Sequence, residues 1–382
     1  MMRPEPAGAV APPRRGDLAV EELGAQALVT CAAEWDALAR ASAEAAPFTS
    51  SGWTRAWCES FAPGARLRLL CARREGRAVA FAPLIEKRWR LLGCPLALWQ
   101  SASNEHSQRT DWALGPEGEE AVGALWGHLR DQGWEALLLK DIVQGGVIDR
   151  TIGAAAESDG FLVARWPSLQ SPWLPVVSPE QLERSLDARF RANLRRRRRK
   201  LAGHGEVLLQ RVDSLEGLGE ALEEGFRLEA SGWKGEQGTA IACAPQTRSF
   251  YTALAKVAAE QRWLSLYFLK VGGRTVAFHF GLQVGGRYFL LKPGYDESLG
   301  ECSPGQLLVD EVLRDLFHRG ARELDFLGPR MTWKLDWTQR LRPHCWLFVL
   351  RPTLKGRALH AARFRLGPRA ARWVRGVVRW KH

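Results

Sequence analysis

The chain of 382 residues consists of two halves in which the same order of helices and strands is predicted. The repeat is clearest in one hairpin, where residues 75–81 read EGRAVAF and residues 272–278 read GGRTVAF, identical at five of seven positions. In each half a glycine, Gly133 or Gly320, then ends a helix and precedes an apolar strand. A recurring order of elements at similar spacing indicates an internal duplication. The chain is therefore expected to form two lobes of one α/β fold.

Each lobe is expected to hold a mixed, largely antiparallel sheet flanked by helices. In the C-terminal half, Gly272-Gly273 and Gly285-Gly286 fit two-residue hairpin turns between three predicted strands. Apolar residues at helical spacing predict a helix that begins near residue 304. The strands expected in this half cover 206–212, 263–271, 274–283, 287–293, 322–327 and 345–351, and the helices lie near 184–202, 215–230, 245–261 and 304–319. The N-terminal half is expected to have strands at 26–31, 67–73, 77–85 and 135–140, and helices near 33–43, 50–60 and 117–131.

Positive charge is concentrated in two segments of the chain, whose net charge is +12. Residues 351–382 hold ten Lys or Arg and no acid, and residues 184–203 hold nine Lys or Arg and one acid. Two basic elements on an otherwise acidic body predict a polyanionic partner, a membrane surface or a charged ligand. The alternative is that both segments are ordinary solvated helices.

Cysteine usage and the absence of targeting signals predict a cytoplasmic protein. The seven cysteines are far apart and include no CxxC pair, which is typical of reduced thiols and argues against a metal site. No apolar run approaches the ~18 residues of a membrane span. The start is rich in Pro, Ala and Arg and lacks the apolar core of a secretory signal, so residues 1–20 are interpreted as a disordered leader.

The last segment, residues 353–382, is interpreted as a basic amphipathic tail. Trp373, Val377 and Trp380 recur at helical spacing, and arginine covers most of the remaining surface. A helix of this kind lies in the interface of an anionic bilayer, which would place residues 357–382 at the inner membrane face. Docking of the Trp side on the acidic body of the protein is the other interpretation.

The start of the predicted helix at 304 differs from its counterpart in the N-terminal half. The N-terminal copy opens with GPEGEE at 115–120, and these carboxylates would repel a phosphate. The C-terminal copy opens with CSPGQLL at 302–308, has Ser303 at the N-cap position and has no acid before Asp310. Free N–H groups and the helix dipole predict an anion site for a pyrophosphate here. An ordinary capped helix is the alternative.

Four segments of the C-terminal half resemble, in the same order, the GNAT-type domain of the CelD-like acetyltransferases, relatives of the FemAB transferases. They are LEASGWKG at 228–235, SPGQLL at 303–308, LDFLGP at 324–329 and WKLDW at 333–337. The resemblance covers roughly residues 175–350 and extends weakly over 25–170. It implies tandem GNAT-like lobes, with a degenerate N-terminal lobe at 21–170 and an acyltransferase domain at 171–352.

The resemblance also implies an activity. An acyl group, expected to be acetyl from acetyl-CoA as co-substrate and without a metal, would move to an amine or hydroxyl of a small molecule or glycan in polysaccharide or cell-envelope biosynthesis. The phosphate cradle of GNAT enzymes, Gln/Arg-x-x-Gly-x-Gly/Ala, is absent here. The residues in its place, predicted to bind the donor, are Ser303, Gly305, Gln306 and Leu307.

Two other functions remain open at this point. FemAB relatives use aminoacyl-tRNA, and the arginine run at 195–199 could bind such an RNA. The chain would then be an aminoacyl-tRNA-dependent transferase. A non-catalytic adaptor for membrane or nucleic acid is the third reading.

Acyl transfer needs a base for the acceptor, donors for the oxyanion and an acid for the leaving thiolate. His279 lies on a predicted central strand, and Tyr295 follows a strand end where a pocket would open. Glu229 and Asp325 are the other predicted catalytic residues. A core role for His279 and an ion pair between Asp325 and Lys334 are the structural alternatives. The predicted substrate-binding residues are Trp233, Lys234, Lys334 and Trp337, of which the tryptophans could equally be core residues.

Overall fold

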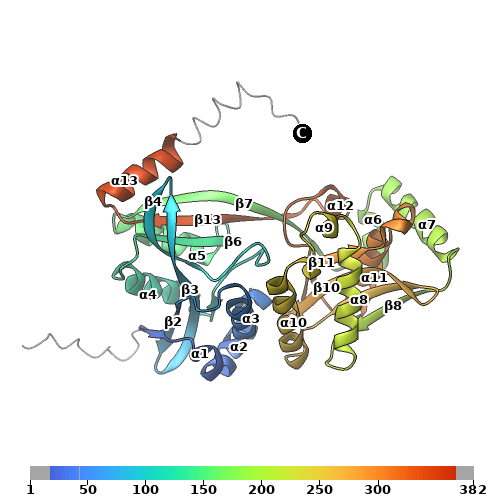
Figure 1. Ribbon diagram of the computed structural model, residues 1–382, viewed down its shortest axis with the longest axis horizontal. Coiled ribbons are helices and arrows are strands. Elements are labelled where there is room, and N and C mark those ends of the chain that lie inside the picture. The colour runs from blue at the N-terminus through green and yellow to red at the C-terminus, as the bar shows by residue number, and fades with distance from the viewer. Residues whose placement is uncertain (1–17, 43, 367–382) are drawn as a thin grey trace, which may run out of the picture.

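The computed structural model describes residues 18–42 and 44–366. The tail residues Trp373, Val377 and Trp380 therefore lie outside the described part, as does most of the expected leader. Residues 18–20, which were assigned to that leader, instead begin a strand. Figure 1 shows two lobes side by side, joined by long strands that run between them.

The strands form one mixed sheet in the order β1-β2-β3-β4-β6-β13-β7-β12-β11-β10-β9-β8, with β5 beside β3. Their bounds are β1 (Leu18–Leu23), β2 (Leu67–Arg74), β3 (Arg77–Leu91), β4 (Cys94–Ser101), β5 (Ala113–Leu114), β6 (Ala136–Val143), β7 (Leu162–Pro175), β8 (Val207–Val212), β9 (Leu266–Val271), β10 (Arg274–Val284), β11 (Arg287–Tyr295), β12 (Glu323–Asp325) and β13 (Leu341–Leu350). The helices are α1 (Ala27–Thr30), α2 (Ala32–Ala41), α3 (Ser51–Phe61), α4 (Gly118–Arg130), α5 (Val147–Ser158), α6 (Pro179–Ser185), α7 (Ala188–Ala202), α8 (Leu218–Ala230), α9 (Trp233–Glu236), α10 (Pro245–Glu260), α11 (Pro304–His318), α12 (Thr332–Leu335) and α13 (Leu354–His360). The expected α/β class with a largely antiparallel sheet is confirmed.

The order of elements repeats between the lobes, as the sequence predicted. In the N-terminal lobe β2, β3 and β4 are antiparallel neighbours, and β4 pairs in parallel with β6 across helix α4. In the C-terminal lobe β9, β10 and β11 are antiparallel, and β11 pairs in parallel with β12 across α11. A strand on each side of a helix must run parallel when the connection crosses the sheet, so both lobes contain the same crossover.

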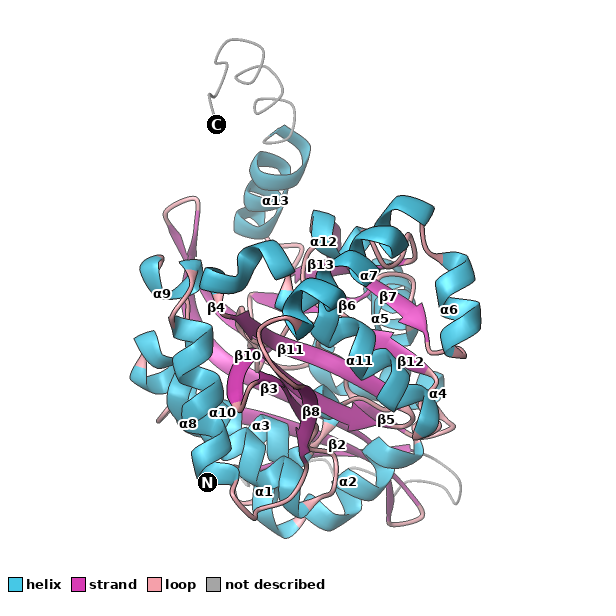
Figure 2. Ribbon diagram, turned by 90° about the vertical axis from the view of Figure 1, so that its right-hand side faces the viewer, coloured by secondary structure: helices cyan, strands magenta, loops and turns pink. Residues whose placement is uncertain are grey.

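Helices cover both faces of the C-terminal sheet (Figure 2). On one face α7 and α11 pack on alternate residues of β9–β11, such as Leu269 and Leu290. On the other face α8 and α10 pack on the intervening residues, such as Phe268 and Phe289. Residues that alternate along a strand point to opposite faces, so both faces of these strands are apolar and buried.

The two lobes exchange strands at their junction. The first part of β7 pairs with β13, whereas its last residues, Trp173–Pro175, pair with β12 of the C-terminal lobe. In return β13 lies between β6 and β7, among the strands of the N-terminal lobe. The strand expected at 345–351 is confirmed, but its neighbours belong to the other half. The division into domains at residues 170 and 171 remains our proposal.

Two expected elements differ in the structure. The strand predicted at 26–31 is instead the short helix α1, in which Ala27 and Leu28 are buried and Val29 is 62% exposed. The single helix expected at 184–202 is divided into α6 and α7. The helix is interrupted at Asp187. The side chain of Asp187 accepts the N–H groups of Arg189 and Phe190 and so caps the start of α7.

Candidate functional site

A cavity of about 560 Å³ lies in the C-terminal lobe, where β11 and β12 separate. The two strands pair over only three residues, from Arg287 with Glu323 to Phe289 with Asp325. Beyond that point β12 ends, while β11 continues along β10 as far as Tyr295. The space left between them is closed by helices instead of by a strand. Seven of the predicted site residues line the cavity, namely Glu229, His279, Tyr295, Ser303, Gly305, Gln306 and Lys334.

Glu229 reaches the cavity because helix α8 lies unusually close to β11. A Cβ atom added to Gly294 would lie 2.8 Å from the Cα of Glu229, so only glycine allows this approach. One carboxylate oxygen of Glu229 accepts the N–H of Ile241 at 2.7 Å, and the other lies 3.9 Å from Nζ of Lys292. The buried carboxylate is therefore held in one orientation beside a cation.

His279 and Tyr295 come from neighbouring strands. His279 lies on β10 opposite Pro293 of β11 and is 1% exposed. Tyr295 is the last residue of β11 and is 37% exposed at the cavity. An imidazole and a phenol thus line the same cavity as the Glu229 carboxylate, which provides groups that can accept and donate protons.

The start of α11 forms the other side of the cavity. Ser303 occupies the N-cap position in a left-handed conformation, with φ +47°, but its hydroxyl donates to the Gly300 carbonyl and does not cap the helix. The N–H of Gly305 has no acceptor among the described residues. A Cβ at Gly305 would make only an ordinary contact of 3.5 Å with the Tyr295 ring. The fold therefore leaves open space at this position.

The remaining predicted donor residues have structural partners. Gln306 accepts the indole N–H of Trp337 and donates to the Trp333 carbonyl at 3.3 Å, so its amide is fixed at the cavity edge. The side chain of Leu307 is 3% exposed and packs in the core. Trp337 is also buried, with its ring 5.1 Å from that of Phe190. The structure therefore gives these two apolar side chains core positions.

The expected ion pair between Asp325 and Lys334 is wrong. Asp325 pairs with Arg342 and accepts the N–H of Leu327 at 2.8 Å. The ammonium of Lys334 donates to the carbonyls of Leu327 and Pro329. Burial raises the pKa of the Asp325 carboxyl, and the Arg342 charge opposes this effect. Asp325 does not line the cavity, and its carboxylate instead contacts Arg342 of β13. Trp233 and Lys234 lie in α9, directly after Gly232, which lines the cavity.

Among the cavity residues that were not predicted from the sequence are Lys292, Arg197 and Gln108. Lys292 lies in β11, and its position directly before Pro293-Gly294 near the end of this strand could have indicated it. Burial lowers the pKa of Lys292, and Glu229 and Glu105 oppose this effect. Arg197 belongs to the arginine run on α7, but only the helix packing shows which arginine faces the cavity. Gln108 comes from the N-terminal lobe and carries no sequence signal.

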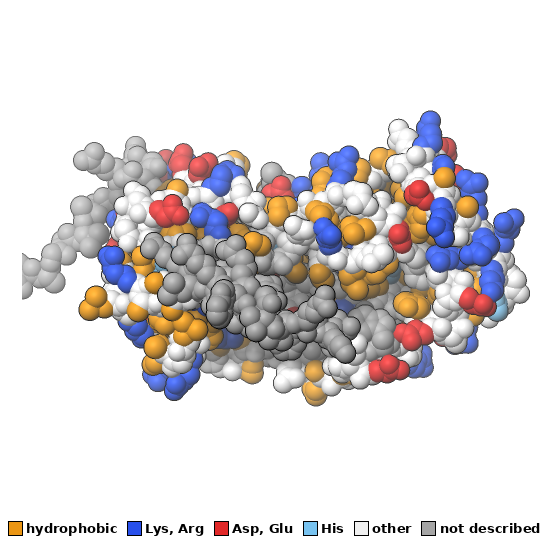
Figure 3. All heavy atoms as spheres, turned by 90° about the horizontal axis from the view of Figure 1, so that it is seen from above, with side chains coloured by type: hydrophobic (Ala, Val, Ile, Leu, Met, Phe, Trp, Pro, Cys, Tyr) orange, Lys and Arg blue, Asp and Glu red, His pale blue; other side chains and the backbone are white. Residues whose placement is uncertain are grey.

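The surface around the cavity is basic on one side. Figure 3, the view from above, shows Lys and Arg side chains gathered at the outer end of the C-terminal lobe, over α7. Arg198 of this helix is paired with Asp310 and Glu311, whereas Arg196 and Arg199 are exposed. The arginine run is thus partly a structural link between α7 and α11.

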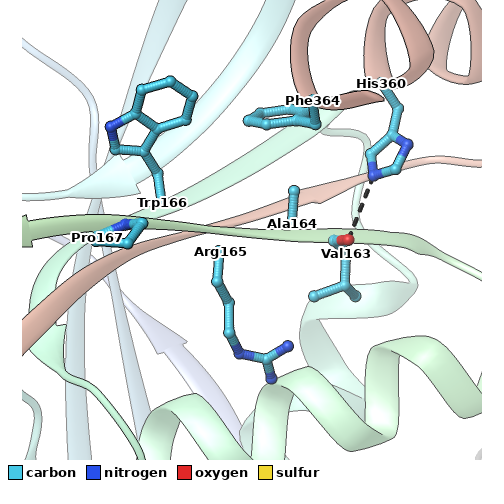
Figure 4. A pocket seen from close by; sticks show the side chains of 7 residues that line it. All are labelled: Val163, Ala164, Arg165, Trp166, Pro167, His360 and Phe364. Atoms are coloured by element: carbon cyan, nitrogen blue, oxygen red, sulfur yellow. Dashed lines mark hydrogen bonds between the residues drawn. The ribbon is translucent and has the colours of Figure 1, made fainter. Parts of the chain in front are cut away.

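A second hollow, of about 460 Å³, lies between β7 and the helical segment at 354–366 (Figure 4). Trp166 and Phe364 face each other across it, while Arg165 points away and binds Asp149 at 2.6 Å. His360 contributes an imidazole whose Nε2 lies 3.3 Å from the Val163 carbonyl. No carboxylate is among its described lining residues, so this hollow offers no acid–base pair for transfer.

Comparison with known protein families concerns mainly the C-terminal lobe. Residues 188–335 match a family model described as an acetyltransferase (GNAT) domain. Over these residues the chain is similar to GNAT acetyltransferases. The match spans the start of α7 to the end of α12 and includes all of the predicted catalytic and donor-binding residues. This match supports an acyltransferase domain of the GNAT type at residues 188–335.

The fold of the two lobes together is that of solved proteins with little sequence identity. A crystal structure of FemX has a TM-score of 0.58 at 13% identity, over 84% of this chain and 95% of that chain. The C-terminal domain of an Agrobacterium fabrum protein described as a lysylphosphatidylglycerol synthetase has a TM-score of 0.54 at 11% identity, over 88% and 96%. A Bacteroides thetaiotaomicron protein of unknown function has a TM-score of 0.54 at 11% identity, over 84% and 97%. No curated protein matches the chain.

No group of three or more His, Cys, Asp or Glu within 18–42 and 44–366 could hold a metal ion. Over the same residues, no helix is both long enough and apolar enough to cross a membrane.

Proposed function

We propose that the cavity between β11 and β12 transfers an acyl group, acetyl from acetyl-CoA, to an amine or hydroxyl acceptor. The observation that carries this proposal is the meeting of two features in one cavity. The open start of α11 provides a place for an anion, and Glu229, His279 and Tyr295 provide proton-transfer groups beside it. The GNAT domain match over the same residues supports it.

The donor's pyrophosphate would bind at the start of α11. The N–H of Gly305 has no acceptor among the described residues, and the positive end of the helix dipole lies here. Arg197 from α7 lines the same cavity and supplies a full positive charge. Glu297 and Asp336 also line the cavity, and the Asp336 carboxylate lies close to Arg197 and 3.4 Å from the Gln306 amide, so the Arg197 charge has to offset its repulsion of a phosphate. Bound acetyl-CoA would supply the thioester that the acceptor attacks.

The chain's own residues would then move protons. His279 or Glu229 would accept the proton of the attacking amine or hydroxyl, directly or through water. The Tyr295 hydroxyl, at the more exposed end of the cavity, would return a proton to the departing thiolate. Lys334 holds the carbonyls of Leu327 and Pro329 in place and so fixes the wall opposite β11.

The acceptor in this proposal belongs to polysaccharide or cell-envelope biosynthesis, as the CelD-like resemblance implies. The enzyme would act in the cytoplasm, at the inner membrane face if residues 357–382 bind anionic lipid. One alternative has its own observation. Arg196 and Arg199 are exposed on α7 beside the cavity, and the fold is similar to that of FemX, so an aminoacyl-tRNA would be the donor in that case.

Thermal unfolding with each candidate donor tests this proposal, because a ligand that binds only the folded state raises the melting temperature. Acetyl-CoA is expected to stabilise the wild type and Gly305→Ala, whose added methyl meets only an ordinary contact. Gly305→Glu places a carboxylate against the phosphates and is expected to abolish CoA binding.

Calorimetry on the folded variants gives the decisive comparison. Equal CoA affinity in wild type and a folded Gly305→Glu variant would exclude the donor site at α11. Stabilisation by aminoacyl-tRNA without any effect of acetyl-CoA would favour the FemAB-like alternative. Stabilisation by generic polyanions alone would favour the adaptor.

A further inference from the structure

The N-terminal lobe contributes a residue to the cavity of the GNAT domain. Residues 102–112, between β4 and β5, cross to the C-terminal lobe and bring Gln108 into the cavity wall. The other described residues that line the cavity come from Arg197 to Asp336. Gln108 is therefore the point at which the N-terminal lobe reaches the proposed site of transfer.

The amide of Gln108 faces the cavity with unused hydrogen-bonding capacity. It packs against Gly328, where an added Cβ would lie 3.0 Å from Oε1 of Gln108. Gly328 also has φ +59°, so glycine is favoured there for two reasons. The Gln108 side chain makes no hydrogen bond with any residue that the structure describes. A glutamine amide has two donors and one accepting oxygen, and all of them are available to a ligand.

On one side, the loop is anchored by the residue that follows Gln108. Arg109 is 1% exposed and binds Glu44 at 2.9 Å and Asp111 at 3.1 Å. The N–H of Thr110 donates to the Asp141 carbonyl at 3.1 Å. These contacts fix the backbone directly after Gln108, so its amide is held in place before a ligand binds.

On the other side, the loop is anchored by His106. Its ring stacks on Phe61 with centroids 5.3 Å apart and lies 3.5 Å from the Tyr251 hydroxyl. Burial and the charge of Lys292 lower the pKa of His106 to about 4, so the imidazole is neutral near pH 7. Lys292 itself lines the cavity. The loop is therefore held near two cavity residues, Lys292 beside His106 and Gly328 beside Gln108.

We propose that Gln108 is a specificity-determining residue that hydrogen-bonds the acceptor, and that the acceptor is a hydroxylated amine such as an amino sugar. The Glu229 carboxylate matches the amine, and the neutral amide of Gln108 matches a hydroxyl, which both donates and accepts. During transfer the amine nitrogen bonds to the acyl carbon, the carbon–sulfur bond breaks, and the proton lost by the amine leaves with the CoA thiol. This inference rests on the proposed function, because it requires that acyl transfer takes place in this cavity.

Calorimetry on the full chain tests the proposal with two probes, glucosamine and cyclohexylamine, which has no hydroxyl groups. Wild type is expected to bind glucosamine more tightly than cyclohexylamine. Gln108→Leu keeps the approximate volume but removes the amide, so glucosamine affinity should fall by roughly 10- to 100-fold. Cyclohexylamine affinity and CoA affinity should stay within about twofold, because neither ligand uses the amide.

Gln144→Leu is the matched control, since Gln144 is exposed in the same lobe and does not line the cavity. Gln108→Asn, which keeps a shorter amide, should lose less affinity than Gln108→Leu. The proposal is overturned if wild type does not bind glucosamine, or if Gln108→Leu binds it as wild type does. The amine titrations are run with and without CoA. Failure of CoA to bind, with the glucosamine results as expected, would overturn the proposed donor and leave Gln108 in its role.

Discussion

Three proton-transfer candidates reach one cavity from three different elements. Glu229 comes from α8, His279 from β10 and Tyr295 from the end of β11. Their meeting depends on Gly294, where any side chain would push α8 and Glu229 away from β11. At the scale of single residues, the site is thus assembled by a close backbone approach as much as by the reactive groups.

Removing a proton-transfer group should slow turnover more than it weakens donor binding. His279→Ala or Tyr295→Phe is expected to reduce kcat by roughly 10²–10⁴-fold, because the transition state loses a positioned acid or base. Steady-state kinetics together with the CoA dissociation constant would show this. Near-normal turnover in both variants would transfer the role to Glu229 or to positioning alone.

Sequence reasoning located much of the cavity but not its contacts across the molecule. The contrast between the two helix starts pointed to Ser303 and Gly305, and both line the cavity. The partner of Asp325 was wrong because Lys334, nine residues away, seemed nearest, whereas Arg342 reaches it by the return of β13. Gln108 could not be found, since its place depends on how one lobe packs against the other.

At the scale of elements, the strands were predictable and their partners were not. The continuous apolar run at residues 345–350 predicted a strand at 345–351 wherever it pairs. Its insertion between β6 and β7 follows from the path of the chain after α12, which no local pattern records. The helix break at Asp187 was not predicted, because the basic residues that follow it on α7 favour one continuous helix in the sequence. The capping role of Asp187 was therefore overlooked.

A chain that ends at residue 340 should fail to fold, because it lacks β13. The five buried apolar side chains of β13 would be lost, those of Cys345, Leu347, Phe348, Val349 and Leu350. Each large apolar side chain contributes about 1.5–3 kcal/mol when buried, which together is comparable with the whole stability of about 5–15 kcal/mol. Circular dichroism and solubility would be measured for this chain and for a control that ends at residue 366. A cooperative, native-like melt of the shorter chain would contradict this view of β13.

At the scale of the whole molecule, the two lobes share an apolar core and are linked by ion pairs. Residues of α3 and α10 pack together in one apolar cluster, and a Cβ at Gly52 would lie 2.3 Å from a Val257 side-chain carbon. Glu44 of the N-terminal lobe binds Arg109 at 2.9 Å and Arg287 of the C-terminal lobe at 3.3 Å. The lobes are therefore expected to unfold as one unit.

Two buried histidines should make that unit sensitive to acid. Burial and the charges of Arg109 and Arg342 lower the pKa of His344 to about 3, and burial and the charge of Lys292 lower the pKa of His106 to about 4. The unfolded chain takes up these protons near pH 6.5, so the free energy of unfolding falls as pH drops below that value. Each histidine contributes up to about 1.4 kcal/mol per pH unit between 6.5 and its folded pKa. Burial raises the pKa of Asp325, which opposes this trend above the ordinary aspartate value.

Urea unfolding at pH 7.5, 6.5 and 5.5 measures this slope. His344→Gln and His106→Gln should each be less sensitive to acid than wild type, whatever their stability at pH 7.5. An identical pH slope in wild type and both variants would show that other groups control the acid response.

The return of β13 has a consequence for how the protein is made. Domains usually fold in order as they leave the ribosome, the N-terminal one first. Here the N-terminal sheet has an open place between β6 and β7 that only residues 341–350 fill. The sheet of the N-terminal lobe therefore stays incomplete until the C-terminal lobe has been translated. During that time the edges of β6 and β7 lack their partner strand. Nascent chains stalled before residue 341 should accordingly bind holdase chaperones, and those stalled well after residue 350 should release them.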